Sequence, residues 1–534
     1  MYEKAMIDQD EADKLYDVII AGAGPIGLFL AHELGLAGTS VLVLERDPNP
    51  ESQWKIEPLG FRGFNTSSVE AFHRRGLLDE LSADEPLWPT KFEKKPGFQF
   101  GGHFAGIPFN VNQLDLSRHP YKINGPALLG RPTTIAKIES ILENRLKDMD
   151  ATIIRGSGVS RIVSENEVCV KLETQDRKQY RARWLVGCDG GRSVVRKLAG
   201  FDFVGIDAKF TGYALDCDLT GLVPQKLKPG FVPTDSGMYI TRPPNMMYLI
   251  DFDGGAFDRT QEMTRGHLTE VIRRVTCRKD VEVPEFKLAG TFTDRTRQAT
   301  KYKRGRTLLC GDAAHIHPPL GGQGLNLGIG DAMNLGWKLA ATVKNEIKQD
   351  NVVDTTLLDT YETERHPIGE WLMEWTRAQV LTIEPGPHAA AMRQLIRDFV
   401  ATDDGANMFI DRFFGLSLHY DFSGSDESPH PLLGHSVPDF ELQDGTRLGS
   451  KMREGKGLLL ELEENDELEY YLHKYRSTTQ VQYTSIRVKD TCGISALLVR
   501  PDGFVAWVAE HDQERDIDSL HKALQKWFGV NDRA

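Results

Sequence analysis

The sequence predicts an α/β protein with a parallel core, a β-rich region inserted into that core and a separate C-terminal domain. A strand, a glycine turn, a helix and a second strand follow in order between residues 17 and 45. Another strand-to-helix junction lies at 306–340, and β-rich stretches lie between and after these segments. The length of 534 residues itself suggests about three domains.

The composition is that of a globular protein that contacts neither nucleic acid nor membrane. Hydrophobic residues make up 40% of the chain, and the formal net charge of −13 disfavours broad contact with polyanions. The N-terminus is charged and lacks an apolar signal core, and no apolar run approaches the length of about 20 residues that a transmembrane helix needs. The six cysteines form no CxxC pair. We therefore expect a cytoplasmic protein with reduced, structural thiols.

A nucleotide-binding turn is predicted directly after the first strand, Asp17–Ala21, which is short and apolar like a central parallel strand. Three glycines follow in G-x-G-x-x-G spacing, and a proline stands at the first helical position, which needs no N–H. Bare backbone lets a pyrophosphate approach, and the helix N-terminus offers N–H groups to it. The predicted binding residues are Gly22, Gly24, Pro25 and Gly27.

An acidic residue then indicates which nucleotide binds. Glu45 follows the second strand, Val41–Leu44, at a position where a carboxylate accepts both hydroxyls of a ribose. Arg46 comes next and could instead favour a 2′-phosphate, as in NADP. The carboxylate of Glu45 favours the adenosine of NAD or FAD over that of NADP. A tight structural turn is the alternative interpretation, and the ordered strand, glycines, helix, strand and acid argue against it.

A second and a third motif follow. "RARWLVGCDGGRSVVRKLAG" reads as a strand, Trp184–Cys188, an Asp189-Gly190 turn and a helix start. "RTLLCGDAAHIHPPLGGQGLNLGIGDAMNLGWKLA" places Asp312, a proline pair and several glycines between a buried strand and a long helix. No second G-x-G-x-x-G appears, which argues against a reductase built from two Rossmann domains.

These three motifs, with "LLDTYETERHP" at Leu357–Pro367, resemble the fingerprints of the class A, single-component FAD-dependent aromatic hydroxylases. The resemblance is greatest to the branch of phenol hydroxylases, aromatic polyketide hydroxylases and rifampicin monooxygenases. It implies a Rossmann-like FAD-binding domain of the GR2 type, an inserted β-sheet substrate domain and a thioredoxin-like C-terminal domain. The C-terminal domain has no CxxC and so cannot perform dithiol redox chemistry.

The resemblance also implies roles for the residues of the motifs. The acids would lie near the pyrophosphate and the ribityl chain, and the helix start would stabilise the anion of reduced flavin. A stiff loop would form the wall beside the reactive face of the ring. The further cofactor-binding residues are Asp189, Gly311, Asp312, Gly324, Leu325 and Asn326. The loop residues are Pro319, Gly321 and Gly322, and the sequence names no general base.

Two segments depart from the family pattern. "PLGFRGFNTSSVE" contains Arg62 in a shifted register, and "RPTTIAKIESIL" has Ile135 where relatives often have a glutamine. Arg131 is the candidate substitute there, so both arginines are predicted cofactor contacts. His315 and His317 are two residues apart with no third ligand placed, which is poor support for a metal site. We predict none.

The motifs divide the chain into four parts. The predicted FAD-binding domain comprises 1–86, 130–202 and 294–380, the substrate domain 87–129 and 203–293, a helical linker 381–425, and the C-terminal domain 426–534. Apolar and aromatic residues of the substrate domain are predicted to supply the core or the pocket: Phe98, Phe100, Phe104, Phe109, Met238, Tyr239, Met246, Met247 and Tyr248.

The resemblance implies a reaction as well. FAD would bind without a covalent bond, NADPH or NADH would reduce it, and O2 would form a hydroperoxide at flavin C4a that hydroxylates a phenolic or polycyclic aromatic substrate. Baeyer–Villiger or epoxidising chemistry on the same fold is the alternative. More distant alternatives are a flavin dehydrogenase and a non-catalytic binding protein with the FAD-binding fold. A homodimer is possible.

Overall fold

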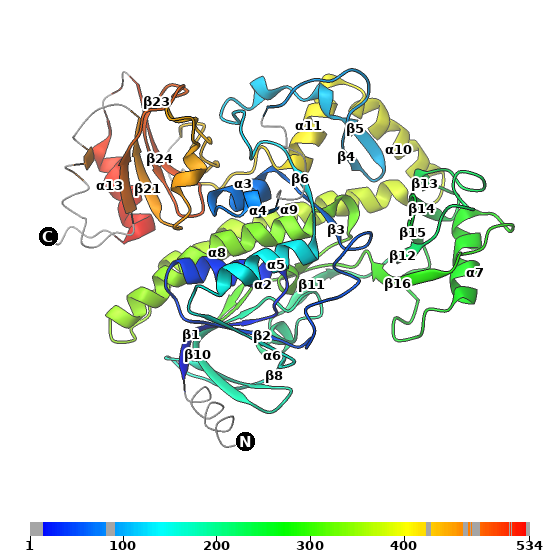
Figure 1. Ribbon diagram of the computed structural model, residues 1–534, viewed down its shortest axis with the longest axis horizontal. Helices are drawn as coiled ribbons and strands as arrows, with labels where there is room; N and C mark the ends of the chain where they lie inside the picture. Colours follow the sequence, from blue (N-terminus) through cyan, green and yellow to red (C-terminus); the bar gives the residue numbers. More distant parts are fainter. Residues whose placement is uncertain are drawn as a thin grey trace.

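The structure is a computed structural model of the chain, and it describes residues 14–81, 91–422, 429–462, 468, 469, 471, 481–511, 513 and 515–529. The first residues of the predicted 87–129 segment and part of the predicted linker lie outside these ranges. Figure 1 shows the C-terminal sheet at one end of the molecule and a second sheet, β12 to β16, at the other. The long helices α8 and α9 lie between them.

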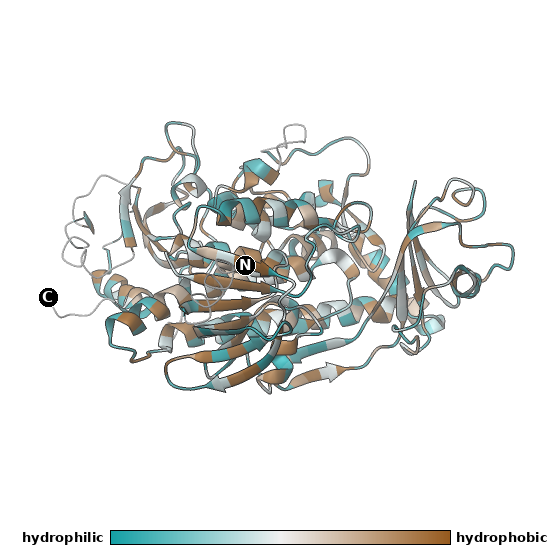
Figure 2. Cartoon of the chain, turned by 60° about the horizontal axis from the view of Figure 1, so that its bottom comes forward, coloured by the Kyte–Doolittle hydropathy of each residue, from teal (hydrophilic) through white to brown (hydrophobic). Residues whose placement is uncertain are grey.

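A parallel sheet forms the core, and its strands occur in the order β19-β10-β1-β2-β7. β10 is long because it serves two neighbours: its first residues pair with β9 and its last with β19. Figure 2 shows these strands as mostly apolar, as expected for strands covered on both faces. The strands of this sheet are β1 Leu15–Ala21, β2 Val41–Glu45, β7 Ala151–Arg155, β8 Val159–Glu165, β9 Val170–Thr174, β10 Gln179–Gly187, β18 Lys303–Arg304 and β19 Thr307–Leu309.

Helix α2, Pro25–Leu36, packs against α8, Gly324–Lys348, and against α5, Ile135–Leu146. Close packing explains why α2 is apolar on nearly all sides, since Leu28 to Leu34 are all buried. Gly38 follows the end of α2 with φ +71, a left-handed conformation in which glycine commonly ends a helix.

Shorter elements surround this core. They are β3 Phe61–Phe64, α3 Thr66–Arg74, α4 Leu78–Leu81, β6 Arg131–Thr134, α6 Val194–Leu198, β11 Phe203–Ile206, β17 Thr296–Ala299 and β20 His315–Ile316. Helix α9, Thr356–Ile383, packs along α8 and runs three residues past the predicted domain end at 380.

An antiparallel sheet in the order β13-β14-β15-β12-β16 forms the second unit. One face packs on α7, Arg265–Thr276, through a buried cluster that includes Tyr213, Tyr239 and Leu249. The other face bears a row of paired residues: Ile240, Tyr248, Ala214 and Gly290. The strands are β12 Thr211–Cys217, β13 Gly230–Pro233, β14 Gly237–Arg242, β15 Met246–Asp251 and β16 Phe286–Thr293.

The hairpin of β4, Phe100–Phe104, and β5, Ile107–Asn110, pairs with no strand of that sheet and packs instead on α11, Asp403–Phe414. The prediction that Phe98 and Phe100 supply core or pocket is wrong, because their side chains are 57% and 63% exposed. Sequence alternation identified the strands, but it could not show that Phe98, which precedes β4, and Phe100, the first residue of β4, are left uncovered. Helix α10 spans Pro387–Val400. The predicted domain boundaries stay predictions.

The C-terminal unit is a four-stranded sheet in the order β22-β21-β23-β24, with β21 and β22 parallel and the other pairs antiparallel. Its elements are β21 Gly457–Glu461, β22 Val481–Ser485, β23 Ile494–Val499, β24 Val505–Glu510 and α13 Ile517–Phe528. No helix within the described part of the chain is long and apolar enough to cross a membrane.

Candidate active site

The glycine turn between β1 and α2 leaves a cradle of bare backbone. A Cβ on Gly27 would lie 2.0 Å from the Gly22 carbonyl oxygen, and one on Gly22 would lie 2.5 Å from the Cys188 carbonyl oxygen. These two glycines therefore allow the turn to pack against its own chain and against β10. Around the Cβ position of Gly24, by contrast, there is no atom within 4 Å. Gly24 thus faces open space where a ligand can approach the backbone.

The N-terminus of α2 is polar and uncapped. Gly24 is the N-cap and makes no side-chain cap, and Pro25 occupies the first turn. The first intrahelical bond is Leu28 N–H to Gly24 O, so the N–H groups of Ile26 and Gly27 donate to no described group. Glu45 lies beside them and accepts the Ala23 N–H at 2.7 Å. The turn thus presents free N–H groups and the positive end of a helix, which suit a pyrophosphate.

Asp189 follows β10 next to the same turn, since a Cβ on Gly22 would lie 3.2 Å from the Asp189 Cα. Its carboxylate accepts hydrogen bonds from the Ser193 hydroxyl and from the N–H groups of Val194 and Val195. The side chain therefore organises the start of α6, and it is the backbone of this turn that adjoins the glycines.

Asp312 presents a carboxylate that accepts no hydrogen bond from the described residues, and its side chain is exposed. The preceding Gly311 has φ +65, and a Cβ on Gly324 would lie 3.8 Å from Asp312 Oδ1. Burial lowers the pKa of the Arg62 guanidinium, and the charges of Tyr248 and Asp312 oppose this shift. The acid is thus placed at the start of α8 and left free for a ligand.

The loop before α8 is held in a backbone conformation that favours glycine. Pro319 precedes a short 3-10 turn, and Gly321 and Gly322 have φ of +77 and +65. No side chain caps α8, and its first intrahelical bond is donated by Leu327 to Gln323. The N–H groups of Gly324, Leu325 and Asn326 donate to no group in the described part of the chain.

The Asn326 side chain fixes this loop to two other segments. Its amide nitrogen donates to the carbonyls of Gly63 and Gly322, and its amide oxygen accepts the Asn65 N–H at 2.9 Å. The side chain is therefore fully occupied by backbone groups. Only the backbone N–H of Asn326 remains for a cofactor.

A buried ion cluster beneath the loop was not anticipated from the sequence. Asp331 accepts the Gly311 N–H at 3.2 Å, the His315 Nε2 at 2.6 Å and the Arg365 Nε at 2.8 Å. Burial alone would raise the pKa of Asp331, but Arg365 and His315 lower it. Two features of the sequence could have indicated this cluster. They are an acid on the buried face of the 324–340 helix and the arginine of "TERHP".

Arg62 and Arg131 lie on one two-stranded ribbon, β3 with β6, in which Phe64 pairs with Arg131. The Arg62 guanidinium donates to the carbonyls of Leu59 and Phe61 at 3.0 and 2.7 Å. Arg131 donates to the Pro126 carbonyl at 2.8 Å. The ribbon therefore brings the two predicted arginines close together despite 68 intervening residues.

The two histidines of the third motif face different groups. His315 bonds Asp331, whereas the Nδ1 of His317 lies 2.8 Å from the Pro318 carbonyl. Burial lowers the pKa of His317, although Asp312 opposes the shift. No group of three or more potential ligands is gathered for a metal among the described residues.

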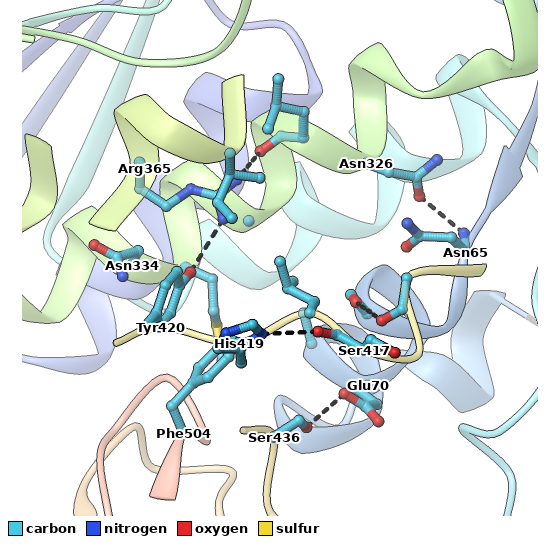
Figure 3. A pocket seen from close by; sticks show the side chains of 18 of the residues that line it. Asn65, Glu70, Asn326, Asn334, Arg365, Ser417, His419, Tyr420, Ser436 and Phe504 are labelled. Atoms are coloured by element: carbon cyan, nitrogen blue, oxygen red, sulfur yellow. Dashed lines mark hydrogen bonds between the residues drawn. The ribbon is translucent and has the colours of Figure 1, made fainter. Parts of the chain in front are cut away.

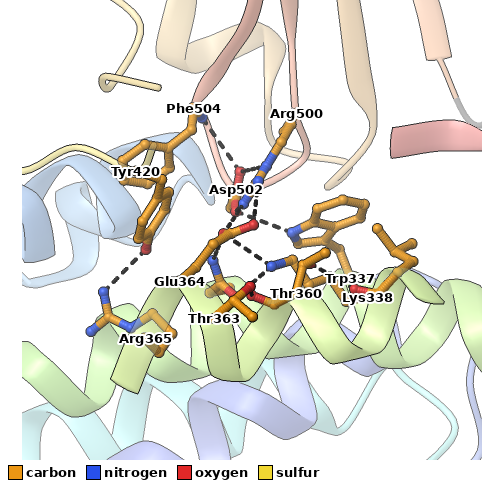
Figure 4. Close-up of polar contacts among 12 residues, drawn as sticks. Trp337, Lys338, Thr360, Thr363, Glu364, Arg365, Tyr420, Arg500, Asp502 and Phe504 are labelled. Atoms are coloured by element: carbon orange, nitrogen blue, oxygen red, sulfur yellow. Dashed lines mark hydrogen bonds and ion pairs between the residues drawn. The ribbon is translucent and has the colours of Figure 1, made fainter. Parts of the chain in front are cut away.

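A second ion network joins the C-terminal unit to α8 and α9 (Figure 4). Arg500 donates to both oxygens of Glu364 at 2.9 and 2.8 Å and also bonds Asp502. Lys338 lies 3.0 Å from Glu364, and the Trp337 indole N–H donates to Asp502. Burial would raise the pKa of Glu364, but Arg500 and Lys338 lower it to about 2.

A cavity of about 430 Å³ is lined by Asp502 of this network and by Gln323 and Asn326 next to the loop, among other residues. Figure 3 shows side chains that line it. Its walls come from α3, α8, α9, the segment that follows α11 and the C-terminal unit. The part of the third motif from Gln323 to Asn334 contributes to its lining, whereas Asp312, the glycine turn and the five-stranded sheet do not. The cavity therefore adjoins the loop before α8 but contains neither the glycine turn nor the Asp312 carboxylate.

Two family models match the chain. One describes the FAD binding domain and covers residues 15–376, and the other describes the C-terminal region of aromatic-ring hydroxylases and covers 430–530. The chain belongs to the FAD-dependent aromatic-ring hydroxylases. This aromatic-ring hydroxylase is a FAD-dependent monooxygenase, which confirms the predicted family, enzyme class and flavin cofactor.

Full-length relatives support this assignment. The hydroxylase is 46% identical over 517 residues to a monooxygenase of Claviceps purpurea, covering 96% of this chain and 97% of the relative. It is 34% identical over 529 residues to rifampicin monooxygenase of Streptomyces venezuelae, covering 97% and 99%. The solved structure of anhydrotetracycline hydroxylase from Streptomyces rimosus matches with a TM-score of 0.80 at 32% identity, covering 97% and 99%.

Proposed function

We propose that the protein hydroxylates a phenolic, polycyclic aromatic compound with O2 and with NADPH or NADH as electron donor. The observation that supports it best is the junction at Gly311–Asn326, where a free carboxylate, three left-handed glycines and an uncapped helix meet. The N–H groups of Gly324, Leu325 and Asn326 suit the electron-rich edge of a flavin, and the helix dipole favours negative charge there.

The residues fit FAD along its whole length. The open space at Gly24 and the free N–H groups of α2 would hold the pyrophosphate, Glu45 the adenosine ribose and Asp312 the ribityl chain. Bound FAD supplies electron transfer from the nicotinamide and activation of O2. The chain must orient the aromatic ring and exclude water from the oxygen-transfer step.

An apolar wall faces the loop from the five-stranded sheet. One buried cluster joins Met238 and Ile250 of the sheet to Leu320 of the loop, with Phe292 and Phe413 packed at its edge. Such walls suit a flat, apolar ligand. Relatives named for rifampicin and for anhydrotetracycline also act on polycyclic compounds, which supports this substrate class. We further propose that the protein forms a homodimer and that its C-terminal domain has a thioredoxin-like fold.

The deciding experiment is a substrate screen. Purified protein is incubated with polycyclic phenols and NADPH or NADH under ¹⁸O2, and products are analysed by mass spectrometry. We expect nicotinamide oxidation coupled to the gain of one labelled oxygen on an aromatic carbon. A labelled ester formed from a ketone would instead establish Baeyer–Villiger chemistry, and oxidation without label would establish a dehydrogenase.

The free carboxylate of Asp312 gives a prediction for cofactor retention. Asp312→Ala should keep the fold, because this exposed side chain accepts no hydrogen bond from the described residues. It should weaken FAD binding by about 1.5–3 kcal/mol, a Kd increase of about ten- to a hundredfold. Fluorescence titration of apoprotein with FAD measures this. An unchanged Kd would show that Asp312 is only a turn residue.

The left-handed glycines give a prediction for coupling. Gly322→Ala adds a methyl group where no atom lies within 4 Å, so its cost is the conformational strain at φ +65, about 1–2 kcal/mol. The strain should loosen the loop and admit water, so nicotinamide oxidation persists while more hydrogen peroxide is released per NADPH. Gly445→Ala is the matched control, since Gly445 has φ +82 and equal space but lies in the C-terminal unit. An unchanged peroxide ratio in Gly322→Ala would contradict the shielding role.

A further inference from the structure

The cavity between the FAD-binding and C-terminal units has the size and the chemistry of a small-molecule site. Its volume of about 430 Å³ lies within the usual range of about 300–1,000 Å³ for ligand pockets. The walls are mostly apolar, with Leu327, Met333, Leu372 and Phe504 among them. Figure 3 shows polar side chains at intervals along these walls, from Asn326 and Asn334 on α8 to Ser417 and His419 on the segment after α11.

Most charges around the cavity are already neutralised. Glu70 lies 2.6 Å from Lys122, and Asp502 bonds Arg500. Arg365 pairs with Asp331. These groups shape the cavity but leave no charge for a ligand to compensate.

Asp411, also on the wall, has no cationic partner among the described residues, and its carboxylate accepts hydrogen bonds from the Ser417 N–H and hydroxyl. Arg412 is the cation of the wall that has no oppositely charged partner within the described part of the chain. It is exposed, and none of the described residues gives it an acidic partner or a hydrogen bond. Its guanidinium lies 5.6 Å from the ring centre of Trp375. A guanidinium held over an aromatic ring with its donors free is suited to a single anionic oxygen.

An aromatic surface adjoins this cation. Trp371 lines the cavity, is 39% exposed and stacks on Trp375 with ring centres 6.0 Å apart and planes at 16°. Within the described part of the chain, its indole N–H donates to no group. The exposed part of Trp371 is thus available for stacking by a further planar ring.

We propose that this cavity, which adjoins the flavin loop but contains neither the glycine turn nor Asp312, is a second binding site for a planar aromatic compound that carries one phenolate or carboxylate group. The ring stacks on Trp371 and the anionic oxygen binds Arg412. The site is coupled to the flavin loop, because Gln323 and Asn326 line it. Gln323 donates to the Phe413 carbonyl and Asn326 to that of Gly322, so an occupant contacts the side chains that hold the loop.

The test measures binding to the oxidised holoprotein without nicotinamide, so its result does not depend on any monooxygenase activity. The probe is 1-hydroxy-2-naphthoate, followed by equilibrium dialysis and by its fluorescence. We expect Trp371→Ala and Arg412→Leu each to weaken binding to one site by about tenfold. Arg377→Leu is the matched control, since the side chain of this arginine of α9 is 40% exposed, does not line the cavity, and pairs among the described residues with Glu374 at 3.5 Å, so the change should leave binding unchanged.

A neutral probe separates charge from stacking. We expect 2-methoxynaphthalene to bind more weakly than the naphthoate and to respond to Trp371→Ala but not to Arg412→Leu. Both variants alter side chains at the cavity mouth and should retain the wild-type circular dichroism spectrum. No binding of the naphthoate to the wild type, or equal affinity in the wild type and both variants, would overturn the proposal.

Discussion

Arg500→Met is expected to lose about 3–5 kcal/mol of unfolding free energy, because it leaves buried acids without their main counter-charge. The Arg500 side chain is fully buried and bonds Glu364 and Asp502. Methionine replaces its apolar volume beneath the Trp527 ring but supplies no donor. Denaturant unfolding monitored by near-UV circular dichroism gives the difference.

A surface pair provides the control for this experiment. Lys489 pairs with Glu441 in the same unit, and its side chain is 57% exposed, so Lys489→Met should cost less than about 1 kcal/mol. Equal losses of unfolding free energy in Arg500→Met and Lys489→Met would show that the Arg500 network contributes little to the stability of the fold.

Acid should weaken the same network in the wild type. Because the pKa of Glu364 is lowered from 4.5 to about 2 in the folded protein, its ionised form stabilises the fold at every pH above 4.5. This contribution should disappear progressively as the pH falls from 4.5 towards 2. Arg500→Met should show a smaller acid dependence in that interval.

The local parts of the site could be predicted from the sequence. Gly24 and Asp312 stand in short motifs whose spacing alone places them at the ends of strands, and both face open space in the structure. The glycine cluster in the sequence permits the left-handed backbone found at Gly321 and Gly322 but does not determine it. Spacing identifies a turn, whereas φ is set by what packs around it.

Contacts between distant segments could not be predicted. Asp331 meets Arg365 only because α8 and α9 pack side by side, and periodicity on each helix does not specify the partner. The prediction for Phe100 is wrong for a similar reason, since alternation marks a strand without showing which of its residues are covered by other segments. The two residues proposed to bind a ligand in the cavity, Trp371 and Arg412, belong to none of the sequence motifs.

Gly24→Val is expected to yield a folded but colourless protein that no longer retains FAD. Gly24 has φ −77 and ψ 179, an extended conformation that valine adopts readily, and no atom lies within 4 Å of its Cβ position. The protein should therefore accept the side chain, which fills the space that the pyrophosphate needs. The absorbance at 450 nm relative to 280 nm measures FAD content, and circular dichroism measures the fold. Gly221→Val is the control, because Gly221 has the same open surroundings but lies between β12 and β13, and this variant should keep its FAD. Gly27→Ala should instead fail to fold, since its Cβ would lie 2.0 Å from the Gly22 oxygen. A yellow Gly24→Val protein with full FAD content would mean that the pyrophosphate binds elsewhere, and the open space at Gly24 would need another explanation.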